Sequence, residues 1–143
     1  MILSDLRILE EIEKGTIKVD PYDRNCLGSN SYDVHLGKWL ATYNEHILDA
    51  KKHNKIDYFE IPEEGFVLYP HIFYLGVTEE YTETHAHVPF LEGKSSTGRL
   101  GIDIHPHPFI LTDNCSCVIT TMRNGEMILL IRQIGFSCIG DPD

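Results

Sequence analysis

Nine consecutive residues near the middle of the chain have side chains suited to binding phosphate. They are three glycines, three hydroxyl residues, two cations and a leucine, in the order Gly93, Lys94, Ser95, Ser96, Thr97, Gly98, Arg99, Leu100 and Gly101. Backbone N–H groups, hydroxyl donors and fixed positive charge in one short segment can together hold a polyanion such as a triphosphate. The segment, called the 93–101 segment below, therefore predicts a nucleotide site; a solvated, glycine-rich surface turn is the alternative on composition alone.

The 93–101 segment is not a Walker A loop, although it contains the Gly-Lys-Ser triplet with which that motif ends. A Walker A loop requires a glycine five residues before its Gly-Lys pair. Val88 occupies that position, and Pro89 follows it. The P-loop interpretation is therefore excluded.

Length and charge limit the classes of function that remain. The chain has 143 residues with 42% hydrophobic content, which suits a single domain with its own core. The formal net charge of −10 argues against a nucleic-acid partner, because nonspecific binding to nucleic acid depends on clustered lysine and arginine. One triphosphate needs only a local cationic pocket, such as Lys94 with Arg99, and Mg²⁺ can carry part of the neutralisation.

Hydropathy predicts where the protein acts. The sequence has no apolar run of bilayer length and no basic-then-apolar leader at its start. We therefore expect a cytoplasmic protein with no membrane partner.

Cysteine and histidine spacing does not predict a metal site. The four cysteines lack zinc-type spacing, so free thiols are expected at Cys26, Cys115, Cys117 and Cys138. Two His-x-His pairs would each share one face of a strand, which leaves metal binding as an alternative. Each pair is also close to a proline and so is typical of a loop edge; the pairs are His85 with His87 and His105 with His107.

Hydrophobic spacing predicts one short helix followed by many short strands. Apolar residues at helical spacing, a capping Ser4 or Asp5 and a terminating Gly15 predict a helix over residues 4–14. Short β-branched and aromatic runs separated by turn residues then predict strands at 34–36, 66–69, 73–77, 85–88 and 102–105. The polar segment 45–54 is expected to be an exposed loop or hairpin insertion. The predicted fold is mainly β, a sandwich or jelly roll with a short N-terminal helix, in one domain over 1–143.

Several segments occur together in an order known from one family. Residues 31–37 read Ser-Tyr-Asp-Val-His-Leu-Gly, residues 66–70 read Phe-Val-Leu-Tyr-Pro, and residues 75–81 read Leu-Gly-Val-Thr-Glu-Glu-Tyr. With the 93–101 segment, they resemble the dCTP deaminase branch of the trimeric dUTPase superfamily over residues 1–105. The resemblance implies a dUTPase-like jelly roll, a homotrimer with sites at subunit boundaries, and a dCTP or dUTP ligand carried with Mg²⁺.

The resemblance also implies an activity and residue roles. The activity is that of a hydrolase on a C–N bond, converting dCTP to dUTP and ammonia in pyrimidine deoxynucleotide metabolism. Ser95 or Ser96 would orient water or phosphate, and Arg99 would anchor and tune a catalytic carboxylate. The residues implied to bind nucleotide are Lys94, Ser95, Ser96, Thr97, Gly98, Arg99 and Gln133. In this family a glutamate, and not a zinc ion, manages the protons of the attacking water.

The match to the family's motifs stops after His105, so that residues 106–143 are divergent or truncated. Family spacing places the catalytic base at Met122, which cannot accept a proton. Glu126 is the nearest downstream carboxylate and is our candidate base, although four residues along a strand amount to roughly 13 Å. Two alternatives therefore remain: a nucleotide-binding relative with impaired catalysis, and a dUTP diphosphatase.

Overall fold

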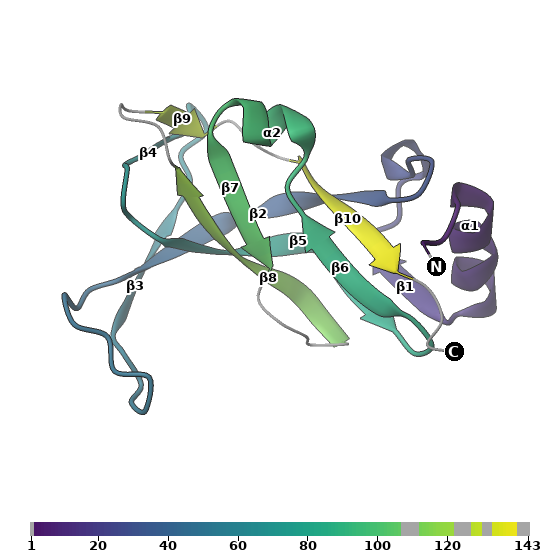
Figure 1. Cartoon of the computed structure of the whole chain (residues 1–143), viewed down its shortest axis with the longest axis horizontal. Helices are drawn as coiled ribbons and strands as arrows, with labels where there is room; N and C mark the ends of the chain where they lie inside the picture. The colour runs from purple at the N-terminus through teal and green to yellow at the C-terminus, as the bar shows by residue number, and fades with distance from the viewer. Residues whose placement is uncertain (1, 107–111, 122–126, 130–132, 140–143) are drawn as a thin grey trace.

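The computed structural model describes residues 2–106, 112–121, 127–129 and 133–139, without the side chains of 106, 112–116 and all residues after 119 (Figure 1). The helical elements are α1 (Asp5–Lys14), η1 (Arg24–Cys26) and α2 (Ser95–Arg99). The strands are β1 (Ile17–Asp20), β2 (Tyr32–Tyr43), β3 (Ile56–Glu60), β4 (Phe66–Leu68), β5 (Tyr74–Thr84), β6 (Val88–Glu92), β7 (Ile102–Pro106), β8 (Thr112–Thr121), β9 (Met127–Leu129) and β10 (Gln133–Ile139).

Among the described residues, eight strands form one antiparallel sheet. Its main path is β6-β10-β2-β5-β8-β7, while β1 pairs with β5 and β3 pairs with β2. A separate pair joins β4 to β9. The register between β2 and β5 shifts between Leu36 and Leu40, and that between β5 and β8 shifts between Val77 and Tyr81. Such irregularities bend a sheet, so β2 can pair with β10 in its first half and with β3 in its second. The mainly β prediction is confirmed.

Helix α1 begins one residue after the predicted start, because Ser4 is its cap, and ends at Lys14 as predicted. The Ser4 hydroxyl accepts a hydrogen bond from the Arg7 backbone N–H at 3.4 Å, which caps the first turn. Gly15 ends the helix with φ 77°, a left-handed conformation that glycine adopts without steric cost. Ile8 is 1% exposed and joins α1 to the core.

The core lies between the sheet, α1 and the β4 segment. Three aromatic rings meet there: Tyr74 packs edge-on against Phe66 and Phe59, with centroids 5.5 and 6.4 Å away. The remaining buried apolar residues come from nearly every strand and include Val34, Leu40, Leu68, Ile104 and Ile119.

The strand predicted at 85–88 is wrong, because the chain turns there. The His85 backbone N–H donates to the Thr16 carbonyl at 2.9 Å, and the Thr84 hydroxyl donates to the His87 carbonyl at 2.8 Å. These bonds replace a strand ladder, and β6 begins only at Val88. Pro89 fits β6 because β6 is the first strand of the sheet path, where a missing N–H costs little.

The other predicted strands and the polar segment are confirmed. The runs at 34–36, 66–69, 73–77 and 102–105 lie in or overlap β2, β4, β5 and β7. Residues 45–54 connect β2 to β3 as the loop of a hairpin that extends away from the rest of the molecule in Figure 1. The loop exposes Ile47 by 86%.

Candidate functional site

The 93–101 segment forms a single helical turn between β6 and β7. Lys94 precedes α2 with extended backbone angles (φ −63°, ψ 148°), and its carbonyl accepts a hydrogen bond from the Gly98 N–H at 3.0 Å. The chain leaves α2 through Gly101, whose φ of 78° again requires the left-handed region. The sequence analysis assigned no secondary structure to this segment, and the structure places residues 95–99 on a short helix at one end of the sheet (Figure 1).

Helix α2 presents hydroxyls and a guanidinium on its outer side. Ser95, Ser96, Gly98 and Arg99 are exposed. Arg99 Nε donates to the Ser95 carbonyl at 3.4 Å, which turns the guanidinium back along the helix. Thr97 is only 4% exposed, so it anchors the helix to the fold. Four of the predicted nucleotide-binding residues therefore share one accessible surface, and Thr97 does not.

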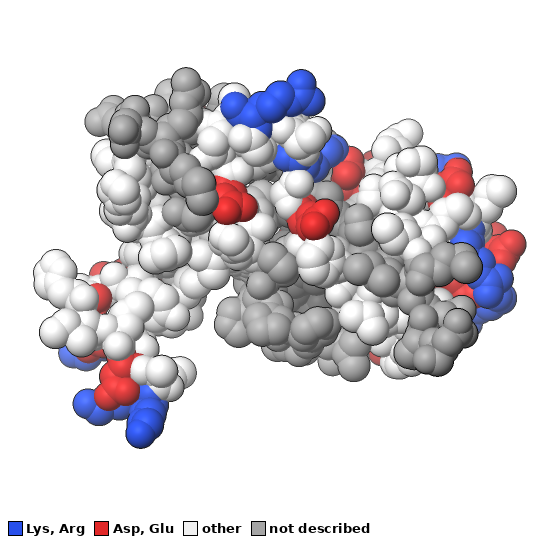
Figure 2. Space-filling view, viewed as in Figure 1, with Lys and Arg blue, Asp and Glu red and all other residues white. Residues whose placement is uncertain are grey.

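The Lys94 side chain forms an ion pair within the protein. Its ammonium group pairs with the Asp33 carboxylate on β2, and the two side chains are 32% and 25% exposed. In Figure 2, basic side chains gather over α2 with acidic side chains beside them. The charge of Lys94 is thus balanced locally, while the guanidinium of Arg99 is exposed.

A second polar pair lies beside the first on β2. The buried Glu80 carboxylate of β5 contacts His35 Nδ1 and also accepts a hydrogen bond from the His35 backbone N–H at 2.8 Å. Gln133 lies directly opposite His35 in the β2–β10 register. The sequence analysis assigned no role to His35 or Glu80. The one available signal was the spacing of Asp33 and His35, because residues i and i+2 of a strand share a face.

Burial and these charges act on two groups next to the pairs. Burial raises the pKa of the Cys26 thiol, and the negative charges of Asp23, Asp33 and Glu80, in that order, raise this pKa further. Burial also raises the pKa of Tyr32 to about 12, although its phenol oxygen accepts a hydrogen bond from the Asp23 N–H at 2.7 Å. Both groups are therefore uncharged near neutral pH and supply no thiolate or phenolate to the site.

The predicted catalytic base lies outside the described residues. Glu126 and Met122 belong to the range 122–126, and Gln133 is described through its backbone alone.

In the described part of the chain, no group of three or more His, Cys, Asp or Glu side chains could hold a metal ion. The same part contains no helix long and apolar enough to cross a membrane.

The three described histidines of the two pairs each lie beside a different carboxylate. His85 Nε2 lies 2.7 Å from Glu83, and the buried His87 Nε2 lies 3.3 Å from Glu11. His105 Nε2 lies 2.9 Å from Asp103, and His107 falls outside the described residues. Two cysteines, Cys26 and Cys117, are buried and form no disulfide, as the sequence predicts.

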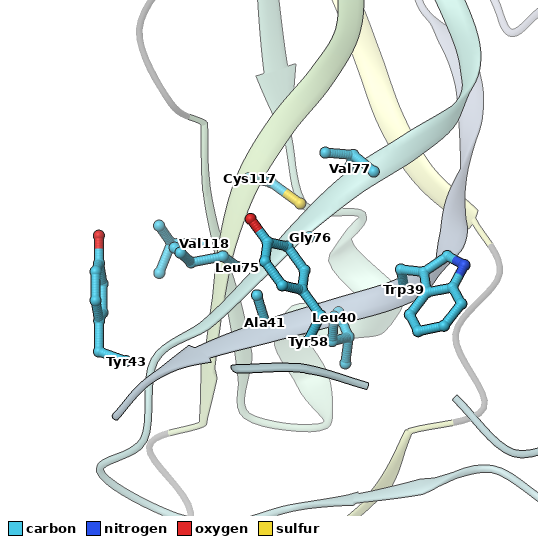
Figure 3. Close-up of a pocket in the computed structure, with 10 residues that line it drawn as sticks. All are labelled: Trp39, Leu40, Ala41, Tyr43, Tyr58, Leu75, Gly76, Val77, Cys117 and Val118. Carbon is cyan, nitrogen blue, oxygen red and sulfur yellow. The ribbon is translucent and has the colours of Figure 1, made fainter. Parts of the chain in front are cut away.

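A separate apolar cavity of about 350 Å³ opens on the sheet (Figure 3). Its lining residues come from β2, β3, β5 and β8; they are Trp39, Leu40, Ala41, Tyr43, Tyr58, Leu75, Gly76, Val77, Cys117 and Val118. Tyr58 is 71% exposed at its rim. This lining, all of it in the described part of the chain, includes no residue of the 93–101 segment, so the cavity and α2 are distinct features.

An antiparallel β fold with a short N-terminal helix and an exposed Ser-Ser-x-x-Arg turn between two of its strands place the chain among mainly β proteins. Within that class, the chain belongs to the dCTP deaminase-like family, whose model matches residues 2–136. The family match extends beyond residue 105, where the motif resemblance ended.

Curated relatives agree with this assignment, and a solved structure shares the fold. The "dCTP deaminase, dUMP-forming" of Leptospira biflexa is 49% identical over 105 residues, which is 73% of this chain and 60% of the relative. The protein of the same name from Clostridium acetobutylicum is 48% identical over the same shares. The crystal structure of 2'-deoxycytidine 5'-triphosphate deaminase from Agrobacterium tumefaciens covers 97% of this chain and 48% of its own, with TM-score 0.70 and 20% identity. The chain thus spans about 60% of the length of these curated relatives.

Proposed function

We propose that the protein deaminates dCTP. Water adds to C4 of the cytosine ring and ammonia leaves, so that dCTP and water give dUTP and ammonia. The observation that carries the proposal is the exposed Ser95, Ser96 and Arg99 on α2, in a chain of the dCTP deaminase-like family. These groups supply the hydroxyl and guanidinium donors that a triphosphate and an attacking water require.

Each residue has a proposed role. Ser95 and Ser96 orient the water or a phosphate oxygen, and Gly98 leaves open space beside the helix, since an added Cβ would meet no atom within 4 Å. Arg99 anchors the catalytic carboxylate and favours its charged form. Glu126 takes the proton of the water and returns a proton to the leaving amino group. Gln133 contacts the nucleotide from β10, where it lies opposite His35.

The proposed Mg²⁺ arrives with the triphosphate. Mg²⁺ keeps several of its waters and binds through substrate phosphates and one or two carboxylates. The groups around α2 are compatible with this mode, because hydroxyls and a guanidinium bind phosphate oxygens while the Asp33 carboxylate is already paired with Lys94, so that the substrate itself would hold the metal. The metal supplies charge neutralisation of the phosphates.

A homotrimer completes the site in this proposal. Within the described part of one chain, Ser95, Ser96 and Arg99 are exposed, and none of them lines the cavity of Figure 3. A neighbouring subunit would supply the second wall of a cleft over α2. The exposed aromatic side chains around the apolar cavity support self-association, because such surfaces are favourable to bury. The single domain over 1–143 and a cytoplasmic location stay predictions.

The names of the relatives favour a second candidate function. Proteins named "dUMP-forming" match over 73% of this chain. If the chain shares that property, dUTP reacts with a further water to give dUMP and pyrophosphate, which joins the predicted diphosphatase alternative to deamination in one enzyme. A relative that binds nucleotide without turnover is the remaining alternative.

One assay separates the three outcomes. The purified protein is incubated with dCTP and Mg²⁺, and ammonia, pyrophosphate and the nucleotide products are measured together. Ammonia with dUTP supports deamination alone, and ammonia with dUMP and pyrophosphate supports the second candidate. Measured dCTP binding without ammonia would leave the non-catalytic alternative.

A further inference from the structure

The position of α2 depends on few contacts. A five-residue helix is not stable alone, because the cost of its first turn is not recovered over so short a length. Its Ser95, Ser96, Gly98 and Arg99 are exposed, and only Thr97 is buried against the fold. The placement of the exposed donors must therefore come from the ends of the helix.

Lys94 supplies one such anchor at the N-terminal end. Its backbone is fixed by the hydrogen bond from Gly98, and its side chain reaches Asp33, 61 residues earlier in the chain. Both side chains of the pair are about one-third exposed or less. A charge pair at this depth is screened less than one at the open surface.

The order of the strands leaves room for the contact between Lys94 and Asp33. Strand β10 lies between β6 and β2, so Lys94 must reach over one intervening strand, roughly 10 Å in all. The residue of β10 in register with both Asp33 and Glu92 is Gly135. Glycine has no side chain that would compete for the space over the strand.

Asp33 is itself held firmly. It lies on β2 between the buried Tyr32 and Val34, which are 2% and 0% exposed. Two residues further along, Glu80 fixes His35 through both its backbone N–H and its ring. The anchor point for Lys94 is therefore a rigid part of the sheet.

The geometry points to Lys94 as a positioning residue, which holds α2 in place through Asp33 and does not bind a phosphate itself. Arg99 is then the cation of the 93–101 segment that faces the ligand. The inference rests on the proposed function for its kinetic readout. It reassigns Lys94, which the sequence pattern groups with the nucleotide ligands.

A positioning role and a phosphate-binding role for Lys94 predict different effects of removing the Asp33 carboxylate. For a positioning pair, Asp33→Asn and Lys94→Met each lower kcat/KM for dCTP by about 10- to 100-fold, because small misplacements of donors are costly. The double variant Asp33→Asn, Lys94→Met has a kcat/KM no lower than that of either single variant. The exchange Asp33→Lys with Lys94→Asp recovers most of the lost kcat/KM, and Lys94→Arg keeps activity. For a phosphate ligand, Asp33→Asn leaves KM unchanged or lowers it, the exchange variant stays as impaired as Lys94→Asp, and the inference is overturned.

Hydrogen exchange keeps the inference separate from the proposed function. Amides of residues 94–101 should exchange faster in both single variants while those of α1 do not change. The matched control is Lys38→Met, which removes an exposed pair with Glu60 at 3.0 Å and should alter neither region. Unchanged exchange at 94–101 in Lys94→Met overturns the inference. Wild-type protein that neither binds nor deaminates dCTP overturns the proposed function alone.

Discussion

The Glu11 carboxylate lies 3.3 Å from Nε2 of His87, in a buried contact that joins α1 to the turn before β6. The Thr16 hydroxyl and the Lys14 ammonium donate to the same carboxylate, the latter at 2.9 Å, and Arg7 lies 3.2 Å away. The Thr16 and Lys14 hydrogen bonds, followed by His87, lower the pKa of Glu11 from its ordinary 4.5 to about 2.

We expect this network to make the docking of α1 dependent on pH. A carboxyl whose pKa falls on folding stabilises the protein above its unfolded pKa, and this stabilisation is lost as pH falls through the folded value. We therefore expect Glu11 to stabilise the fold fully above about pH 4.5 and to lose this effect towards pH 2. Glu11→Gln should lower the unfolding midpoint at pH 7, and the difference from wild type should shrink as acid is added.

The control for that titration is Glu10→Gln. Glu10 is 55% exposed and pairs with Arg7 at 2.7 Å on the outside of the same helix. Exposed pairs of this kind contribute little to stability, so the unfolding midpoint of Glu10→Gln should follow that of wild type at every pH. A Glu11→Gln curve parallel to wild type over the whole acid range would show that Glu11 does not link stability to pH.

Leu40 should be among the most sensitive core positions. It is 0% exposed on β2, at the site of the β2–β5 register shift. Leu40→Ala should lower the free energy of unfolding by about 2–5 kcal/mol, because the sheet can only partly fill the space left by the side chain. Leu48→Ala, at a side chain that is 48% exposed in the hairpin loop, should stay within about 0.5 kcal/mol of wild type in urea denaturation.

Arg99→Ala should separate activity from folding. Its guanidinium is exposed and donates only to the Ser95 carbonyl among the contacts of the described residues, so unfolding should change by no more than about 0.5 kcal/mol. Loss of a donor aimed at developing charge should lower kcat/KM for dCTP by about 100-fold. Arg24→Ala, at the exposed arginine of η1, is the matched control, and equal kinetics for the two variants would remove Arg99 from the site.

Self-association should respond to charge at the cavity rim. Tyr58→Asp introduces a carboxylate at a side chain that is 71% exposed in one chain, so the monomer should fold normally. Sedimentation should show the wild type as a trimer and this variant as smaller species, because burial of an unpaired charge is costly. Ile47→Asp, outside the cavity lining, should keep the wild-type mass. A Tyr58→Asp trimer would place the interface elsewhere.

The sequence predicted those parts of the fold that local chemistry determines. Helix α1 followed from a capping serine, apolar spacing and a terminal glycine. The strand predicted at 85–88 was wrong because hydrogen bonds from His85 to Thr16 and from Thr84 to His87 turn the chain, and neither is visible in a residue pattern.

In the candidate site too, local sequence predicted some features, while contacts between distant segments determine others. Composition pointed to the 93–101 segment without excluding a surface turn, and the family resemblance singled out Ser95, Ser96 and Arg99. The structure shows all three residues exposed. The pairing of Lys94 with Asp33 depends on two strands that are brought together by β10, so no local spacing could predict it. The roles of Glu126 and Gln133 stay predictions.

The most direct test of the central claim is ammonia release from dCTP and Mg²⁺ by the wild-type protein and by Arg99→Ala, measured with dCTP binding in the same preparations. The proposed function predicts one ammonia for each dCTP consumed by the wild type and almost none from the variant. Binding of dCTP by the wild type with no ammonia formed, or equal ammonia release by the two proteins, would contradict it.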